Sequence, residues 1–332
     1  MSVKLRGISY AVDHDTDVRR DLEVIRDELH CTAVLLYGAH IGRLRVAAGI
    51  ARELGLEVWF QPRLADQPQR KVLEHLEMAA RNAEAVRAAH GGVTFVAGCE
   101  HSLFTNGLIP GPHTLIRLKL LRFMPRLQPR VTRKLDALLE QATTRARREV
   151  HGPITYAAAF WEQVDWSRFD IVGVNLYRFE GNAATYAEQI RALHAHGKPV
   201  VITEFGCGAH AGADRTGPAG FLIVQWFRST PRISPGHHRD EQVQATYLRE
   251  LLELYEAEGI AGAFVFTFAM PDFPHRPEDP EHDLDMAGFG VVKVTADRWQ
   301  RKAAFHELAR RYATQGDSSS SSPTSERRTD VI

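Results

Sequence analysis

The feature that most constrains the fold of this chain is a repeated alternation of short apolar runs and amphipathic stretches. The apolar runs predict eight strands, at residues 3–12, 32–37, 56–61, 93–97, 154–160, 171–176, 198–203 and 261–268. Between and after them, helical periodicity predicts helices at residues 18–29, 40–54, 67–89, 130–150, 183–196, 241–258 and 298–312. Such a chain builds either a closed (β/α)8 barrel or an open, doubly wound sheet.

The turn after the first predicted strand favours the barrel. A doubly wound dinucleotide-binding fold carries Gly-x-Gly-x-x-Gly at this turn, whereas this chain has Asp13-His14-Asp15-Thr16, in which Asp15 or Thr16 is the expected N-cap of the first helix. We therefore predict a single (β/α)8 TIM barrel over residues 1–313, with long loops after strands four, seven and eight. Residues 314–332 are rich in serine and poor in apolar side chains, so a disordered tail is predicted there.

Charge and cysteine content exclude several classes of partner and cofactor. Forty-one basic residues balance forty-one acidic ones, so no nucleic-acid partner is expected. Three cysteines are too few for a disulfide framework, and without a Cys-x-x-Cys pair or a nucleotide-binding turn neither a metal nor a cofactor is predicted. Lys4 and Arg6 interrupt the first apolar stretch, and no apolar run reaches 18 residues, so we expect a cytoplasmic protein with no membrane partner.

The candidate site residues are those at the ends of the predicted strands, because functional groups of a TIM barrel gather there. Two glutamates follow their strands directly, Glu100 after strand four and Glu204 after strand seven. The other candidates, which we expect to bind a small-molecule or oligosaccharide substrate, are Tyr10, Tyr37, Gln61, Arg63, His101, Trp161, Asn175, Tyr177, Phe268 and Asp272.

The spacing of the two glutamates indicates a specific chemistry. They lie 104 residues apart, which is three strand–helix units, and strands four and seven face each other across the mouth of an eight-stranded barrel. Retaining glycosidases hold two carboxyl groups about 5–5.5 Å apart, one as nucleophile and one as acid/base. The alternatives are structural: Glu204 in a salt bridge that anchors the next loop, and Glu100 as a loop cap.

Two motifs carry a resemblance to a known superfamily. Residues 198–206, Lys-Pro-Val-Val-Ile-Thr-Glu-Phe-Gly, resemble the nucleophile strand of the (β/α)8 glycoside hydrolases with acid/base Glu after strand four and nucleophile Glu after strand seven. Residues 169–177, Phe-Asp-Ile-Val-Gly-Val-Asn-Leu-Tyr, resemble the sixth strand of that clan. More loosely, the chain resembles actinobacterial glycosidase-like proteins that carry an "abortive infection" label. The resemblance implies Glu204 as nucleophile, Glu100 as acid/base and Tyr177 as hydrogen-bond partner of the nucleophile.

The chain departs from the pattern of that clan at three places. Cys99 stands where the clan has an Asn, no Arg ends strand two, and Phe266 and Phe268 stand in place of the strand-eight Trp. Arg63, after strand three, is the candidate to replace the missing Arg in space.

Three hypotheses about function follow from the sequence. The first is a retaining glycosidase that acts on a β-linked glycoside or glycoconjugate. The second is a noncatalytic barrel that binds a saccharide or a protein partner in phage defence. The third is a metal-dependent hydrolase that uses His101, His210 or the ligand-rich stretch 275–285, for which a solvated loop is the alternative. Four interpretations of the basic stretch 115–125 stay open. It could cover the site, contact a partner, bind an acidic substrate or simply pack on the surface.

Overall fold

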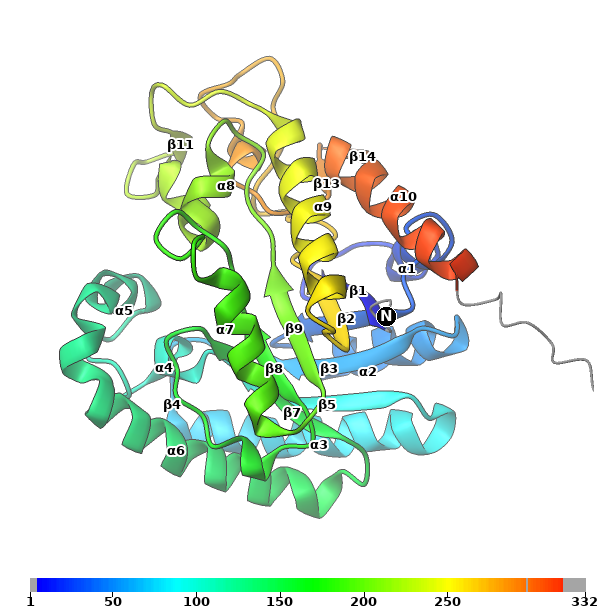
Figure 1. Ribbon diagram of the computed structural model, residues 1–332, viewed down its shortest axis with the longest axis vertical. Helices are drawn as coiled ribbons and strands as arrows, with labels where there is room; N and C mark the ends of the chain where they lie inside the picture. Colours follow the sequence, from blue (N-terminus) through cyan, green and yellow to red (C-terminus); the bar gives the residue numbers. More distant parts are fainter. Residues whose placement is uncertain (1–4, 297, 319–332) are drawn as a thin grey trace, which may run out of the picture.

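Eight parallel strands close into a barrel in the computed structural model, which describes residues 5–296 and 298–318 (Figure 1). Around the ring they follow the order of the chain, so each strand pairs with its sequence neighbours and the last pairs with the first. This is the predicted (β/α)8 TIM barrel. The barrel strands are β1 Leu5–Ala11, β2 Ala33–Gly38, β3 Glu57–Pro62, β5 Val93–Cys99, β7 Ile154–Ala159, β8 Val172–Asn175, β9 Val200–Phe205 and β12 Gly262–Val265.

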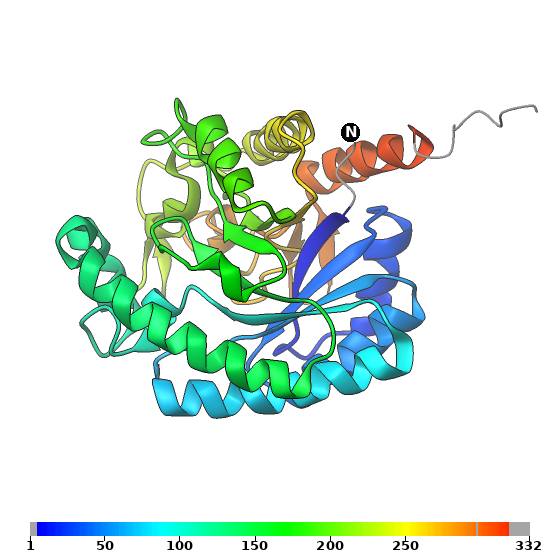
Figure 2. The same cartoon turned by 60° about the horizontal axis from the view of Figure 1, so that its bottom comes forward.

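Helices surround the barrel on its outer side (Figures 1 and 2). Helices α3 and α6 run side by side along one flank, and α9 packs against α10 on another. The helices of the outer layer are α1 Val18–Asp27, α2 Ile41–Glu53, α3 Gln69–His90, α6 Met124–Glu149, α7 Tyr186–Leu193 with η3 His194–His196, α9 Glu241–Ala257 and α10 Ala303–Ser318.

The remaining elements lie in the loops, most of them in the three long loops after β5, β9 and β12, as predicted. The shorter helices are α4 His101–Phe104, α5 Thr114–Leu120, η1 Leu121–Phe123, η2 Trp166–Arg168, α8 Ala213–Thr216, η4 Gly217–Ile223 and η5 Leu284–Met286. The short strands form three two-stranded sheets: β4 Gln67–Pro68 with β6 Thr105–Asn106, β10 Val224–Gln225 with β11 Arg232–Ile233, and β13 Val292–Val294 with β14 Trp299–Arg301.

Several predicted boundaries were wrong. The N-cap of α1 is Asp17, whose side chain accepts a hydrogen bond from the Arg20 N–H. Helix α6 begins at Met124 rather than near residue 130, because proline is tolerated in a first helical turn and the helix also accommodates Pro129. The predicted helix at 298–312 is a short strand followed by α10. That helix is described as far as Ser318, the rest of the predicted tail lies outside the described residues, and the tail stays a prediction.

Alternation along the strands divides the core into two layers. Side chains such as Val34 and Phe60 point outward and pack against the helices, whereas their neighbours Leu35 and Trp59 fill the barrel interior. Trp59 is 1% exposed and its ring centroid lies 5.0 Å from that of Phe264. It is therefore a packing residue.

The end of β5 requires a glycine. Gly98 has φ of 107°, a conformation that other residues rarely adopt, and a Cβ at this position would lie 2.0 Å from His101 Nε2. We predict that Gly98→Ala lowers the free energy of unfolding by at least about 2 kcal/mol, since the backbone strain alone costs about 1–2 kcal/mol. Urea denaturation measures this change.

The matched control is Gly49→Ala, in the interior of α2. A Cβ there meets no atom within 4 Å, and alanine favours the helix. We expect Gly49→Ala to raise the free energy of unfolding by about 0.5–1 kcal/mol. Equal effects of the two substitutions would contradict this explanation of Gly98.

Candidate active site

Glu204 lies in β9, one residue before the end of the strand, and two neighbouring side chains donate hydrogen bonds to its carboxylate. Its carboxylate is buried, with the residue only 5% exposed. The Arg63 guanidinium donates to Oε1, and the Tyr177 hydroxyl donates to Oε2 over 3.0 Å. Burial, and then the charge of Glu204, raises the pKa of Tyr177 well above its usual value, so its hydroxyl remains a donor. Glu204 is thus ion-paired, as the structural alternative required, but its side chain also lines a cavity.

Arg63 reaches Glu204 from the loop after β3. The sequence analysis named this residue as the candidate to replace the arginine that is missing from the end of strand two. Three further contacts orient its guanidinium. Nη2 donates to Gln61 Oε1 over 2.9 Å and contacts Cys99 Sγ at 3.1 Å. The ring of Tyr37 lies with its centroid 4.5 Å from the guanidinium carbon, a cation–π distance. Gln61 and Tyr37 therefore support the site through Arg63, and neither lines the cavity itself.

Glu100 directly follows β5 and has an unusual backbone. Its φ of 42° and ψ of 49° lie in the left-handed region, which turns the chain sharply between β5 and α4. Asn175 Nδ2 donates to Glu100 Oε1 over 2.9 Å, and the Thr203 hydroxyl donates to Asn175 Oδ1 over 2.7 Å, which fixes the amide orientation. Burial and the negative charge of Glu204 raise the pKa of the Glu100 carboxyl to about 8.

Glu162 supports the turn that carries Glu100, a contribution the sequence analysis missed. One of its carboxyl oxygens accepts the Ser102 N–H over 2.8 Å, and the other accepts the Tyr156 hydroxyl and the Ala159 N–H. The Tyr156 hydroxyl also accepts the N–H of His101 over 2.7 Å. These bonds tie the first residues after Glu100 to the end of β7. The sequence feature that could have indicated this role is the acidic residue itself, which lies in the loop after strand five.

Cys99 lies between the two glutamates. Its Sγ is 3.7 Å from Glu204 Oε1 and 3.4 Å from Asn175 Nδ2. Burial raises the pKa of the thiol well above its usual value, so the uncharged thiol is the stable form. Cys99 therefore packs beside Glu204 and Asn175 and lacks the thiolate that a nucleophile requires.

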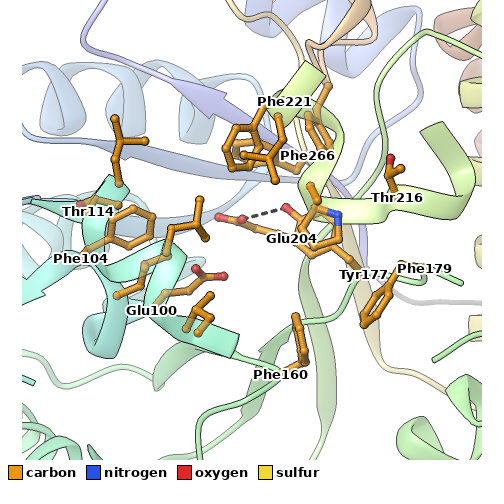
Figure 3. A pocket seen from close by; sticks show the side chains of 18 of the residues that line it. Glu100, Phe104, Thr114, Phe160, Tyr177, Phe179, Glu204, Thr216, Phe221 and Phe266 are labelled. Carbon is orange, nitrogen blue, oxygen red and sulfur yellow. Dashed lines mark hydrogen bonds between the residues drawn. The ribbon is translucent and has the colours of Figure 1, made fainter. Parts of the chain in front are cut away.

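The two glutamates open into one cavity of about 470 Å³. Figure 3 shows both carboxyl groups in it, with Phe104 and Thr114 on one side and Tyr177 and Phe179 on the other. Arg63 and Trp161, both predicted substrate-binding residues, also line it. The remaining lining residues are Leu103, Leu115, Leu118, Leu121, Phe160, Thr216, Pro218, Ala219, Phe221, Leu222, Phe266, Met270, Phe273 and Phe289.

Four residues predicted to bind substrate lie away from this cavity. Tyr10 faces the outer layer, where its hydroxyl donates to Asp21 Oδ2 over 2.9 Å, and Phe268 packs against it. Asp272 lies at the surface, with 81% of its side chain exposed. The ring of His101 turns back onto the barrel, where Nε2 is 3.1 Å from the Ala97 carbonyl, and burial lowers its pKa to about 4. None of these four side chains lines the cavity, and a role of any of them in substrate binding stays a prediction.

The ligand-rich stretch 275–285 forms ion pairs. Asp283 binds both Arg239 and His275, and Asp285 binds Arg239 and Lys302. Across residues 5–296 and 298–318, no group of three or more His, Cys, Asp or Glu side chains is arranged to hold a metal ion. No helix in the same part of the chain has the length and apolar content to cross a bilayer.

The cap segment, residues 101–123 between β5 and α6, covers one side of the cavity. Arg117 anchors it: this side chain is fully buried, pairs with Asp66 and donates through Nε to the Leu103 carbonyl over 2.5 Å. It also donates to Asn106 Oδ1 over 2.6 Å. The basic stretch therefore does cover the site, but its central arginine is a structural anchor and is unavailable to an acidic ligand.

No protein-family model matches the chain, and no curated protein matches it in sequence. Solved structures of glycosidases match it in fold. A GH2 beta-galacturonidase from Eisenbergiella tayi is 15% identical, with a TM-score of 0.60 over 94% of this chain and 51% of that one. A beta-glucuronidase from Bacteroides uniformis is 18% identical, with a TM-score of 0.60 over 93% of this chain and 35% of that one.

A smaller enzyme matches over nearly its whole length. The catalytic core of xylanase A is 12% identical, with a TM-score of 0.54 over 94% of this chain and 98% of that one. The chain thus spans about half the length of the galacturonidase and about a third of the length of the glucuronidase. It spans almost all of the xylanase core. At these identities, the similarity shows the fold, a (β/α)8 barrel of the kind that glycoside hydrolases use.

The Arg63–Glu204 pair predicts a measurable coupling. Arg63→Met leaves a buried carboxylate without its cation, so we expect the free energy of unfolding to fall by about 3 kcal/mol. Adding Glu204→Gln removes that unpaired charge and is expected to restore part of the loss. Urea denaturation of the two single variants and the double variant measures the coupling energy. Strictly additive effects would contradict a direct interaction.

Proposed function

We propose that this chain is a retaining glycosidase that hydrolyses a β-linked glycoside or glycoconjugate. The observation that carries the proposal is a pair of glutamates in one cavity with opposite electrostatic surroundings. Arg63 and Tyr177 compensate the negative charge of Glu204, whereas burial and the charge of Glu204 keep Glu100 protonated up to about pH 8. One ionised and one protonated carboxyl group are what double displacement requires.

In the first step, a Glu204 oxygen attacks the anomeric carbon and the bond from that carbon to the leaving oxygen breaks. Glu100 gives its proton to the leaving oxygen, which departs as an alcohol. In the second step, Glu100, now ionised, accepts a proton from water while the water oxygen attacks the anomeric carbon. Glu204 leaves as a carboxylate, and Glu100 is protonated again. Asn175 holds the Glu100 carboxyl in place during both transfers.

The acid step predicts the alkaline side of the pH profile. Because the pKa of Glu100 is raised to about 8, the required acid form persists below that pH and is lost above it. We expect kcat/KM for a glycoside with a poor leaving group to fall as the pH rises through about 8. For an activated aryl glycoside, which departs without a proton, the fall should be much smaller. A fall that persists unchanged in Glu100→Gln would contradict the assignment.

Substitution of the glutamates tests the proposal most directly. On any glycoside that the protein hydrolyses, we expect Glu100→Gln to lower kcat by about 10²–10⁴-fold, the usual contribution of acid/base catalysis, and Glu204→Gln to lower it at least as much. Glu74→Gln is the matched control, since Glu74 is exposed on α3 and we expect no change there. Unchanged turnover in both site variants would refute the mechanism.

A covalent adduct separates the enzyme from a noncatalytic saccharide-binding barrel. A 2-deoxy-2-fluoro glycoside slows breakdown of the glycosyl-enzyme, so mass spectrometry of a proteolytic digest should place the sugar on Glu204. Labelling of the Arg63→Met variant tests whether the reaction depends on the site. Labelling of the Glu74→Gln variant tests whether an exposed carboxylate takes up the sugar. An adduct elsewhere, or none on a hydrolysed substrate, would count against Glu204 as nucleophile.

A further inference from the structure

Away from the two glutamates, Arg63 and Tyr177, most of the side chains that line the cavity are apolar. Leu115, Leu118 and Leu121 of α5 and η1 form one wall, and Phe221 and Leu222 of η4 also line the cavity. Among the described residues that line the cavity, the charged side chains are confined to Arg63 and the two glutamates. The groups proposed to react therefore lie at the charged end of a mostly apolar pocket.

The leucine wall follows from helical spacing in α5. Leu115, Leu118 and Leu121 recur every three residues, so they share a face that turns toward the cavity. Arg117, on another face, is fully buried against Asp66. The same short helix thus presents leucines to the cavity and holds itself in place by an ion pair, which makes the apolar wall a fixed part of the structure.

Apolar side chains continue to the protein surface near the cavity. Leu115 is 42% exposed and Leu222 is 58% exposed, although both line the cavity. Phe227, which follows η4 in the chain, is 81% exposed, and Lys119 of α5 lies with Nζ 5.4 Å from its ring centroid. Large hydrophobic residues exposed around a pocket are typical of a surface that an apolar ligand covers.

A second sugar would fit this pocket poorly as a leaving group. Its hydroxyls would face leucine side chains, which offer no hydrogen bond, and burying a polar group without a hydrogen bond is unfavourable. An apolar group instead gains free energy from each methylene that leaves water. The volume of about 470 Å³ falls within the range of about 300–1,000 Å³ for pockets that enclose whole small ligands.

We infer that the leaving group of the substrate is a long aliphatic alcohol, which lies between α5 and η4 with its oxygen toward Glu100. This inference rests on the proposed function and specifies its substrate class as an alkyl or similarly apolar glycoside. The sugar end takes the polar base of the cavity, and the chain extends past Leu118 toward Leu222. The free alcohol is the first product of the proposed reaction, so it should bind to the same walls.

Binding of n-alkanols tests the apolar wall without any chemistry. We expect hexanol, octanol and decanol to displace the fluorescent probe anilinonaphthalene sulfonate from the full-length protein with increasing affinity. Transfer of one methylene from water corresponds to a roughly fourfold gain in affinity per added carbon. This value is the upper limit for the expected increase with chain length. Affinity that does not rise with chain length, or no displacement by decanol, would overturn the inference.

Substitutions in the cavity wall test where the alcohol binds. Leu222→Ser, at a largely exposed position that should tolerate a polar side chain, is expected to weaken decanol binding by roughly 16-fold, corresponding to about two methylenes of lost contact. Leu118→Asn should weaken it further, and circular dichroism verifies that this variant is folded. Val46→Ser, 62% exposed on α2 and outside the cavity, is the matched control and should bind like the parent protein. Equal decanol binding by all four proteins would place the alcohol elsewhere and refute the inference.

Turnover separates this inference from the proposed function. With decyl and methyl glycosides of one sugar, we expect kcat/KM to be at least tenfold higher for the decyl compound and Leu222→Ser to remove most of that preference. Methyl glycoside hydrolysis without decanol binding would overturn the apolar leaving group and leave the glycosidase standing. Decanol binding that depends on Leu222, with no glycoside hydrolysed and no adduct on Glu204, would support the apolar site and overturn the glycosidase.

Discussion

The buried carboxylate of Glu204 constrains everything around it. A charge at the end of a barrel strand is stable only when a cation and hydrogen-bond donors compensate it, and here Arg63 and Tyr177 do so. Arg63 in turn requires the Gln61 amide and the face of Tyr37, and the charge of Glu204 helps to hold a proton on Glu100. Residues of β2, β3 and β9 and of the loops after β3, β5 and β8 therefore form one electrostatic unit, in which the pKa of Glu100 is raised.

Much of this arrangement was predictable because it follows from periodicity and strand order. Apolar runs that alternate with helical stretches indicated the barrel, and barrel geometry placed Glu100 and Glu204 opposite each other at its mouth. Asn175 follows from its strand-end position, whereas the role of Tyr177 beside Glu204 came from the resemblance of residues 169–177 to the sixth strand of the clan. The position of Arg63 beside Glu204 was predicted only as a replacement for an arginine absent from strand two, and the reach of its long side chain is what made that exchange possible.

The sequence was least informative where side-chain direction, rather than strand position, decides which residues reach the cavity. Tyr10 and Phe268 occupy strand-end regions, yet both point to the helical layer, and His101 turns back onto Ala97. The sequence could not reveal that Glu100 takes a left-handed backbone, because that conformation depends on Gly98 and on bonds from distant Glu162 and Tyr156. It also gave no means to distinguish Arg117, a buried anchor, from its exposed basic neighbours.

The cap segment has a consequence for how such a protein can diversify. Arg117 and Asp66 fasten it outside the barrel core, and its leucines touch the ligand cavity, while the groups proposed to react lie on the strand ends. One part of the cavity wall is therefore encoded in a stretch of sequence apart from the groups proposed to react. Drift in residues 101–123 can reshape what the cavity admits as long as the anchoring pair persists. An ancestral barrel could acquire new substrates by remodelling one loop, with its charge network left intact.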